Sequence, residues 1–228
     1  MSFKPFNPNA ALRITRQNLP HWRQDGTTYF VTSRLADSLP KHIADEWRKR
    51  RDEWLAQHGA NCVDDLAEEL RLDYQRLFTD KFHDLIDAGH GECFLARREC
   101  ADVLISKMIE GHATCFQLGA WCVMPNHFHA VVEPAKGSML GGIVQHWKGG
   151  SSFTINRLLG RSGSLWVKEP FDHIIRNELQ WRRLSKYVAD NPTKAHLKSG
   201  YVLGFGAEVG LSREEILECI PGLQPVRA

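Results

Sequence analysis

Alternating polar and apolar positions mark several short β-strands along the chain. Residues 27–35, TTYFVTSRL, are rich in β-branched and aromatic side chains, a composition typical of a strand. Two further apolar runs, 115–124 and 127–134, are separated by a Pro-Asn turn signal and therefore predict a hairpin. The pattern also predicts a short strand at 91–95, GECFL, and an extended segment or strand pair at 165–176, LWVKEPFDHIIR.

Apolar residues at helical spacing mark the helices. Two highly charged amphipathic segments, 41–58 and 64–88, follow the first strand and are expected to form an inserted helical pair. Three further helices are expected over 96–112, 138–159 and 177–192, the last of them stopped by the proline at its end. Strands and helices therefore alternate through most of the chain.

This order of elements predicts an α+β fold. Strands alternating with helices around an antiparallel hairpin suggest a ferredoxin-like antiparallel sheet with helices packed on it, plus the helical insertion at about 41–88. We expect an irregular N-terminal arm at 1–26, a single domain at 27–198 and a C-terminal tail at 199–228. Within that Gly-rich tail, SREEILECI has the capping-box spacing of one short helix.

The composition is that of an ordinary globular protein. Its 228 residues, 43% of them hydrophobic, suffice for one domain with additional segments, or at most for two small domains. No run approaches the roughly 18 apolar residues of a membrane span, so we expect a cytoplasmic protein with no membrane partner. The six cysteines are scattered without a Cys-x-x-Cys pair, which indicates reduced thiols and neither a zinc knuckle nor a disulfide framework.

The charges are unevenly distributed. Between residues 37 and 92, fourteen acidic residues stand against eight Lys and Arg, whereas between 136 and 200 eleven Lys and Arg stand against four acidic residues. The second region is therefore the better candidate for contact with a polyanion. A charged run is also the usual composition of a solvated surface, so the charge balance alone does not establish nucleic-acid binding.

Two histidines one residue apart stand on the strand predicted at 127–134. Successive side chains of a strand point to opposite faces, so His127 and His129 project together while Phe128 points into the core. Two imidazoles on one face are half of a metal site, although two structural or solvent-facing histidines have the same spacing. The histidine triad of nucleotide hydrolases is excluded because Val131 occupies its third position. A third ligand must therefore come from elsewhere.

The predicted helix 177–192 supplies two candidate partners for these histidines. In KYVADNP, Tyr187 and Asn191 are four residues apart and therefore share a helical face. The alternative is a packing tyrosine followed by a C-terminal cap, since Asn before Pro commonly ends a helix. The upstream histidine pair, the basic region and the lack of a competing Cys or Ser motif favour the catalytic interpretation.

This combination resembles the HUH single-tyrosine transposase family, in particular the REP-associated tyrosine transposases of bacteria. The resemblance rests on WCVMPNHFHAVVEP at 121–134, SGSLWVKEPFDHIIRN at 162–177 and LSKYVADNPTKAHL at 184–197, and it extends over roughly residues 27–197. It implies a ferredoxin-like core, a divalent metal held by the two histidines, and Tyr187 as the nucleophile on single-stranded DNA. Asn191 matches the position at which these families place the third metal ligand.

The resemblance also implies a mechanism. Mg²⁺ or Mn²⁺ on His127, His129 and Asn191 aligns a scissile phosphate, and Tyr187 attacks to give a 5′-phosphotyrosine and a free 3′-OH. A phenol ionises only near about pH 10, so the metal or a nearby cation such as Lys186 must assist. The covalent link conserves the phosphodiester energy, so rejoining requires no ATP.

Single-stranded DNA with REP-like hairpins is the expected partner. Basic and aromatic side chains of the positive region are candidates for phosphate contact and base stacking. They are Lys148, Arg157, Arg161, Trp166, Lys168, Arg176, Arg182, Arg183 and Lys186. For Trp166, the alternative to base stacking is packing in the hydrophobic core.

Two other functions fit the same residues. The first is a catalytically idle DNA-hairpin-binding regulator of the same fold, against which the intact set of two histidines, tyrosine and asparagine argues. The second is a replication initiator or relaxase, which usually needs a larger chain. The sequence leaves open both a monomer and a homodimer, and it does not identify the DNA target.

Overall fold

The structure is a computed structural model that describes residues 3–16 and 20–223. The chain divides into two compact units. The sheet unit comprises Met1–Ala36 and Phe94–Ala228, and the helical unit comprises Asp37–Cys93. The domain boundaries expected from the sequence stay predictions.

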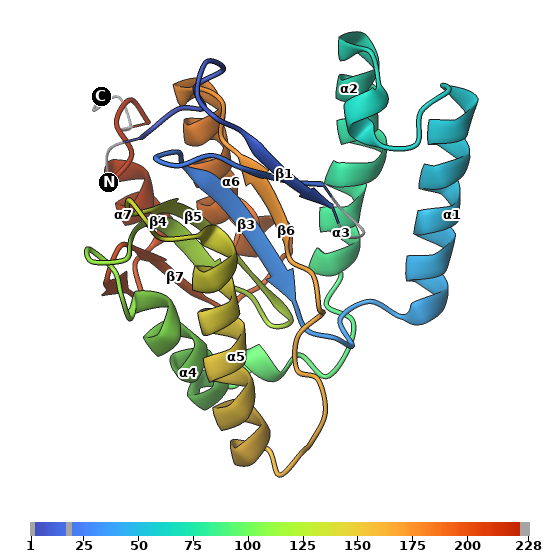
Figure 1. Cartoon of the computed structure of the whole chain (residues 1–228). Helices are drawn as coiled ribbons and strands as arrows, with labels where there is room; N and C mark the ends of the chain where they lie inside the picture. Colours follow the sequence, from blue (N-terminus) through green and yellow to red (C-terminus); the bar gives the residue numbers. More distant parts are fainter. Residues whose placement is uncertain (1–2, 17–19, 224–228) are drawn as a thin grey trace, which may run out of the picture. The chain divides into compact units, whose positions relative to one another are not determined.

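A six-stranded antiparallel sheet organises the sheet unit, with the strand order β6-β3-β5-β4-β7-β8 (Figure 1). Its strands are β3 (Tyr29–Arg34), β4 (Phe116–Val123), β5 (His127–Pro134), β6 (Phe171–Ile174), β7 (Val202–Phe205) and β8 (Glu208–Val209). Helix α4 (Arg98–Ile109) precedes the β4–β5 hairpin and α5 (Leu140–Leu158) follows it. The order β6-β3-β5-β4 places the fourth core strand beside the first and the third beside the second, which is the ferredoxin-like arrangement. The predicted α+β fold class is confirmed.

Helices cover both faces of this sheet because its strands are apolar on both faces. On one face Tyr29, Val31 and Phe128 pack against α4 and α5. On the other face Phe30 and Val131 pack against α6 (Glu178–Lys194) and α7 (Arg213–Glu218). Each buried apolar side chain of this size contributes about 1.5–3 kcal/mol. Neighbouring residues of one strand thus belong to two different hydrophobic cores.

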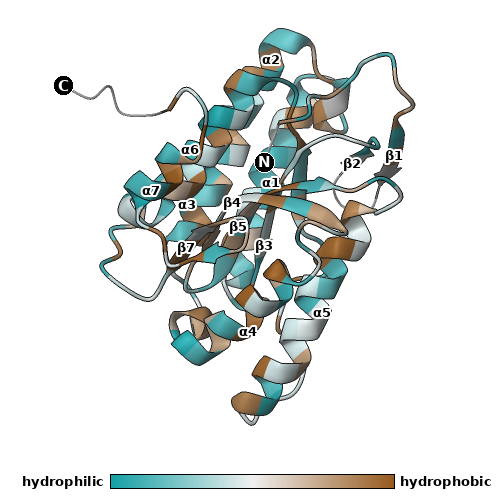
Figure 2. Cartoon of the chain, turned by 90° about the vertical axis from the view of Figure 1, so that its left-hand side faces the viewer, coloured by the Kyte–Doolittle hydropathy of each residue, from teal (hydrophilic) through white to brown (hydrophobic). Residues whose placement is uncertain are grey.

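Helix α5 shows how the hydrophobic spacing predicted an element. Its inward side includes Ile143, Val144, Trp147 and Ile155, while its exposed residues include the polar Gln145 and Arg157 and also the apolar Phe153, and Figure 2 shows both colours along it. Its start at Leu140 lies two residues after the predicted one.

Helix α6 corrects one prediction, because it does not stop at Pro192 but continues to Lys194. Proline lacks an N–H and cannot bond to the carbonyl of the preceding turn. The turn is nevertheless maintained by Ala195 N–H bonding to the Asn191 carbonyl and by Leu197 N–H bonding to the Pro192 carbonyl. Pro192 itself is buried. The helix is therefore two residues longer than expected and includes Lys194.

The prediction of a strand at 91–95 was wrong. Residues Phe94–Ala96 form a 3₁₀ turn, η3, and Cys93 before it has a positive φ of 50°, which is incompatible with an extended strand. The apolar side chains of GECFL were the misleading signal, since Leu95 is buried without belonging to the sheet.

Both ends of the chain contain more structure than expected. The N-terminal arm includes a hairpin of β1 (Arg13–Arg16) and β2 (Pro20–Arg23), and β7 of the expected tail pairs with β4. A Cβ on Gly204 would lie 2.1 Å from the Trp121 ring, so only glycine lets β7 approach there. The short helix predicted at SREEILECI is confirmed as α7, with the capping box between Ser212 and Glu215.

The helical unit is built from α1 (Lys41–Gln57), η1 (Val63–Asp65), α2 (Glu68–Tyr74), the π-helical η2 (Gln75–Asp80) and α3 (Lys81–Asp87). Leu55, Ala60 and Leu66 form its small core. Trp47 packs on Phe82 with ring centroids 4.9 Å apart. These apolar contacts confirm amphipathic helices in the predicted insertion. Among the residues described, no helix has both the length and the apolar character needed to cross a lipid bilayer.

A buried ionic network joins β2 to β6 and the segment before it. His21 bonds through Nδ1 to Asp172 at 2.7 Å and through Nε2 to Glu169 at 2.8 Å, and Arg23 bonds to both oxygens of Asp172. The bond to Asp172 raises the pKa of His21. Burial raises the pKa of Asp172, but its bonds to His21 and Arg23 outweigh burial and lower that pKa. Only a doubly protonated imidazole can donate to both carboxylates.

This network predicts a pH-dependent contribution to stability. Because the folded-state pKa of His21 is raised, its stabilisation is fully present below about pH 6.5 and is lost as the pH rises through the raised value. We expect His21→Gln to lower the free energy of unfolding by about 1–3 kcal/mol at pH 6 and by less at pH 9. Urea denaturation of both proteins at each pH measures this difference.

The control for this prediction is His58→Gln, which changes an exposed histidine. Lys148 lies near Glu169, and burial lowers its pKa to about 8, so both proteins lose its charge between pH 6 and pH 9. An equal loss of stability at pH 6 and pH 9 would show that His21 contributes packing and not charge.

Candidate active site

The period of strand β5 places its two histidines on the α6 face of the sheet. Phe128 lies in the core beneath α4 and α5, whereas the ring of His129 contacts Tyr187 of α6. His127 and His129 are opposite Arg34 and Thr32 of β3, respectively, in the antiparallel register. The predicted alternation of side chains along this strand is confirmed.

Hydrogen bonds orient both imidazoles through their Nδ1 atoms. His127 Nδ1 lies 2.7 Å from Asn126 Oδ1, and His129 Nδ1 lies 2.7 Å from Thr32 Oγ1. The amide oxygen of Asn126 can only accept, so His127 carries its proton on Nδ1 and presents the lone pair of Nε2. The Thr32 hydroxyl can accept in the same way from His129. Partners of this kind are those that orient metal-binding histidines.

The two Nε2 atoms converge to 3.0 Å. An octahedral ion with metal–ligand distances of roughly 2.1 Å has adjacent ligands about 3.0 Å apart. The separation therefore fits two neighbouring positions of one octahedral ion. Without an ion, a proton on His129 Nε2 would donate to His127 Nε2 across the same distance.

Tyr187 lies directly against this histidine pair. Its ring meets His129 edge-on at a centroid distance of 5.2 Å and meets Phe30 edge-on at 6.0 Å. Phe30 in turn stacks on His129 at 5.4 Å and 18°. The three rings restrict one another, so the tyrosine is held beside the imidazoles while remaining partly exposed.

Asn191 joins the cluster one turn further along α6. Its Nδ2 donates to Tyr187 Oη at 3.1 Å, and the residue is fully buried. The helix cap is Ala195, so the structure does not use Asn191 as the C-terminal cap that was the alternative interpretation. With Nδ2 directed to Tyr187, the amide has its carbonyl oxygen Oδ1 as the atom that can bind a cation.

Local interactions at the start of α6 set the position of these residues along the sheet. Asn177 caps the helix by accepting from the Gln180 N–H at 2.8 Å, and Gln180 Nε2 lies 2.7 Å from His173 Nε2 on β6. Burial lowers the pKa of His173 to about 4, with Arg176 and Arg183 contributing, so this histidine is a neutral structural partner. Tyr187 is thus positioned from a capped and anchored helix start.

Two of the predicted DNA-contacting side chains lie in the interior. Lys148 is buried and donates to the backbone carbonyls of Val167 and Lys168 at 2.7 and 2.9 Å. Trp166 is 5% exposed and donates to Ser151 Oγ at 3.0 Å. Burial favours a structural role for both residues, so neither is included in the DNA-binding surface proposed below.

The remaining predicted cations differ in how the protein uses them. Arg182 pairs with Glu178 at 2.6 Å, Lys186 pairs with Asp190, and Arg161 bonds to Asn156 at 2.8 Å. Four others are exposed, and the described residues form no ion pair with them. They are Arg157, Lys168, Arg176 and Arg183.

Sequence inspection did not identify the groups that orient the site. Thr32, Phe30 and Asn126 become visible only through the β3–β5 register and the turn before β5. Lys194 was also missed, because the helix was expected to end before it. Its ammonium Nζ lies 4.6 Å from the centroid of the Tyr187 ring. The seven-residue spacing, two helical turns, was the available signal.

No protein-family model and no curated protein sequence matches the chain. One similar solved structure is described as a REP-associated tyrosine transposase bound to a REP hairpin. It is 17% identical, with a TM-score of 0.42, and the match covers 78% of this chain and 74% of that one. A likeness this distant does not assign a function.

The geometry of the histidine pair predicts specific losses of metal affinity. Replacing either imidazole by Ala removes a ligand, so we expect His127→Ala and His129→Ala to abolish measurable Mn²⁺ binding in titration calorimetry. Thr32→Val leaves the ligand but removes the group that orients it, and we expect affinity to fall about 10- to 100-fold.

His42→Ala, which changes an exposed histidine, is the control and should bind Mn²⁺ like the parent protein. Unchanged affinity in both variants of the pair would exclude a metal site at these imidazoles.

Proposed function

We propose that the protein is a metal-dependent single-stranded DNA nickase and strand transferase, a transposase-type enzyme that uses Tyr187 as its nucleophile. The observation that carries the proposal is the contact of the Tyr187 ring with His129, 5.2 Å between centroids, beside two Nε2 atoms that converge to 3.0 Å. A phenol, two imidazoles and a buried amide meet at one place. The sequence resemblance to HUH transposases assigns roles to these same four residues.

His127, His129 and Asn191 are the proposed ligands. Two neutral imidazoles and an amide oxygen leave further coordination positions open, and they suit Mn²⁺ somewhat better than Mg²⁺, which prefers an all-oxygen shell. When bound, the ion supplies Lewis-acid stabilisation of the charge on a scissile phosphate.

Tyr187 performs the transfer. Its Oη attacks phosphorus, a new Oη–P bond forms, and the bond from phosphorus to the 3′-oxygen breaks in line with it. The phenolic proton passes to solvent and the departing 3′-oxygen takes a proton, so one phosphodiester is exchanged for another. The Asn191 amide and the ring of Phe30 hold the phenol in place during the attack.

Three of the exposed cations supply the proposed strand-binding surface. Arg176 and Arg183 flank the start of α6, and Lys168 precedes β6. Arg157 is left out, because α5 packs on the opposite face of the sheet from α6. Exposed guanidinium and ammonium groups without internal carboxylate partners can neutralise phosphates without first breaking an ion pair. A single strand with REP-like hairpins is the substrate that the sequence resemblance favours.

A hairpin-binding regulator without catalysis is the second candidate. It would need the same cationic surface but no convergence of nucleophile and imidazoles. The position of Tyr187 directly against the converging imidazoles favours the enzyme, because a binding protein does not need a nucleophile at that place.

The central prediction concerns the covalent intermediate. Incubating the protein with end-labelled single-stranded hairpins from its own genomic flanks and Mn²⁺ should give a denaturation-resistant protein–DNA adduct. Tyr187→Phe should abolish the adduct and change DNA affinity by no more than about three-fold, because one hydroxyl contributes little to binding.

Tyr201→Phe provides a matched control, since Tyr201 also packs beside α6 and should retain the adduct. An adduct formed at full rate by the Tyr187 variant would contradict this choice of nucleophile. Hairpin binding without any adduct in the parent protein would instead support the regulator.

The proposed surface predicts how binding depends on salt. Each phosphate contact contributes about 0.7 to the slope of log affinity against log salt for single strands, so Arg176→Gln combined with Arg183→Gln should reduce that slope by about 1.4. Fluorescence anisotropy of one labelled hairpin over a salt series measures it.

Glu68→Lys combined with Glu69→Lys in the acidic helical unit is the comparison, and we expect the slope to stay within about 0.3 of the parent. A full slope in the arginine variant would place the DNA surface elsewhere.

A further inference from the structure

We infer that Lys194 is the phosphate-binding and positioning residue of the nucleophile, an inference that rests on the proposed function. The Nζ atom of Lys194 stands 4.6 Å from the centroid of the Tyr187 ring. A cation at this distance over an aromatic face is attracted to the ring and restricts its orientation. Lys194 therefore adds a further contact to a ring that also meets His129 and Phe30.

The course of α6 explains why Lys194 reaches the tyrosine. The two residues are seven positions apart, two turns of a helix, and so lie on one side of it. The helix keeps this alignment only because it continues through Pro192 to Lys194. Had it ended at the proline, the lysine would have left the helical face.

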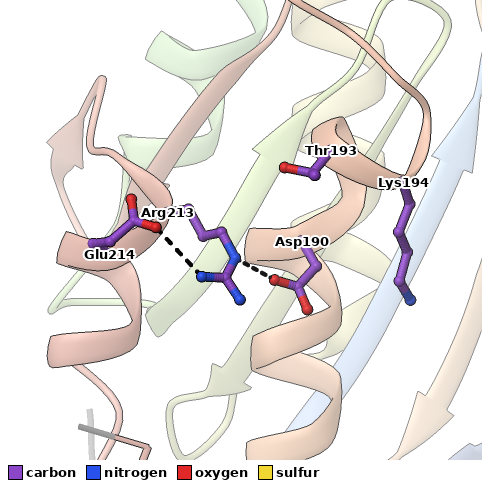
Figure 3. Close-up of a pocket in the computed structure, with 5 residues that line it drawn as sticks. All are labelled: Asp190, Thr193, Lys194, Arg213 and Glu214. Atoms are coloured by element: carbon purple, nitrogen blue, oxygen red, sulfur yellow. Dashed lines mark hydrogen bonds and ion pairs between the residues drawn. The ribbon is translucent and has the colours of Figure 1, made fainter. Parts of the chain in front are cut away.

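Ion pairing distinguishes Lys194 from the other cations nearby. A cavity of about 500 Å³ beside the end of α6 is lined by Asp190, Thr193, Lys194, Arg213 and Glu214. Figure 3 shows Arg213 bonded to Asp190 and Glu214, while Lys194 extends along the other side of the helix. Lys186, the cation first suggested by the sequence, is also held by Asp190. Among the described residues, no carboxylate pairs with Lys194, and its side chain is exposed.

An exposed ammonium resting on the nucleophile suits a phosphate as its ligand. The attack converts the phenol into an aryl phosphodiester, which places non-bridging oxygens next to the ring that Lys194 already contacts. The side chain is long and flexible, so its Nζ can exchange the ring face for one of these oxygens without moving the backbone. Lys194 would thus orient Tyr187 before the strand arrives and bind the phosphate afterwards.

Charge and shape at position 194 are separable by substitution. Lys194→Met keeps a hydrophobic stem over the ring and removes the charge, whereas Lys194→Arg keeps the charge. Lys198→Met removes a second exposed lysine four residues on and serves as the matched control. Binding of oligo(dT) in EDTA tests phosphate contact without cleavage, and the single-turnover rate of adduct formation with Mn²⁺ and the hairpin tests catalysis.

We expect Lys194→Met to lower the salt slope for oligo(dT) by about 0.7, which corresponds to about five-fold weaker binding near 0.1 M salt. The adduct should form about 10- to 100-fold more slowly. Lys194→Arg should restore most of both properties, and Lys198→Met should leave the adduct rate unchanged. Rescue by arginine distinguishes a charge acting on phosphate from packing.

Two results would overturn the inference. An unchanged slope and adduct rate in Lys194→Met would show that this lysine contacts no phosphate while leaving the nuclease proposal intact. Equal defects in Lys194→Met and Lys194→Arg would show that the residue only packs. If instead the slope falls as expected but the parent protein forms no adduct, the lysine–phosphate contact is supported and the nuclease proposal is contradicted.

Discussion

The antiparallel pairing of β5 with β3 is the interaction on which the candidate site depends. It places Thr32 opposite His129 and Phe30 opposite Val131, so that the ring of Phe30 and the hydroxyl of Thr32 contact one imidazole. A shift of one residue would move both histidines into the core under α4 and α5 and bring Phe128 to the α6 face. The two hydrophobic cores oppose such a shift, because each side of the strand has its own complementary helices.

The second requirement is the length of α6. Its capped start at Asn177 and its continuation past Pro192 set Tyr187, Asn191 and Lys194 on one side at intervals of one or two turns. Pro192 has no N–H and so lacks one backbone hydrogen bond, but the N–H groups of Ala195 and Leu197 still bond to the carbonyls of Asn191 and Pro192. The helix thereby presents a tyrosine, an amide and a cation in a fixed order on the face of the sheet that carries the histidines.

Much of this arrangement was predictable, and the failures have specific physical causes. The order of strands and helices and the shared face of His127 and His129 follow from periods of 2 and 3.6 residues, which are local properties. The strand β7 was missed because its pairing requires a residue without a Cβ at Gly204, next to the ring of Trp121. These two residues are far apart in the sequence. The orienting roles of Thr32 and Asn126 were missed for the same reason. GECFL was wrongly predicted to be a strand because the sequence shows that Leu95 is apolar but not whether it is buried in a sheet or, as here, in a 3₁₀ turn.

The charges show why composition alone is a poor guide to a binding surface. The basic region of the sequence contains cations of three kinds: Lys148 is buried against carbonyls, Lys186 is neutralised by Asp190, and Arg183 is exposed without an ion pair among the described residues. Only the third kind can meet a phosphate without the free-energy cost of breaking an internal contact. The effective positive surface is therefore smaller than the count of Lys and Arg suggests, and part of it lies along α6, where Arg183 precedes Tyr187 by one turn and Lys194 follows it by two. In the proposed reaction, a strand lying along this helix would have its charge balanced on both sides of the phosphate that Tyr187 attacks.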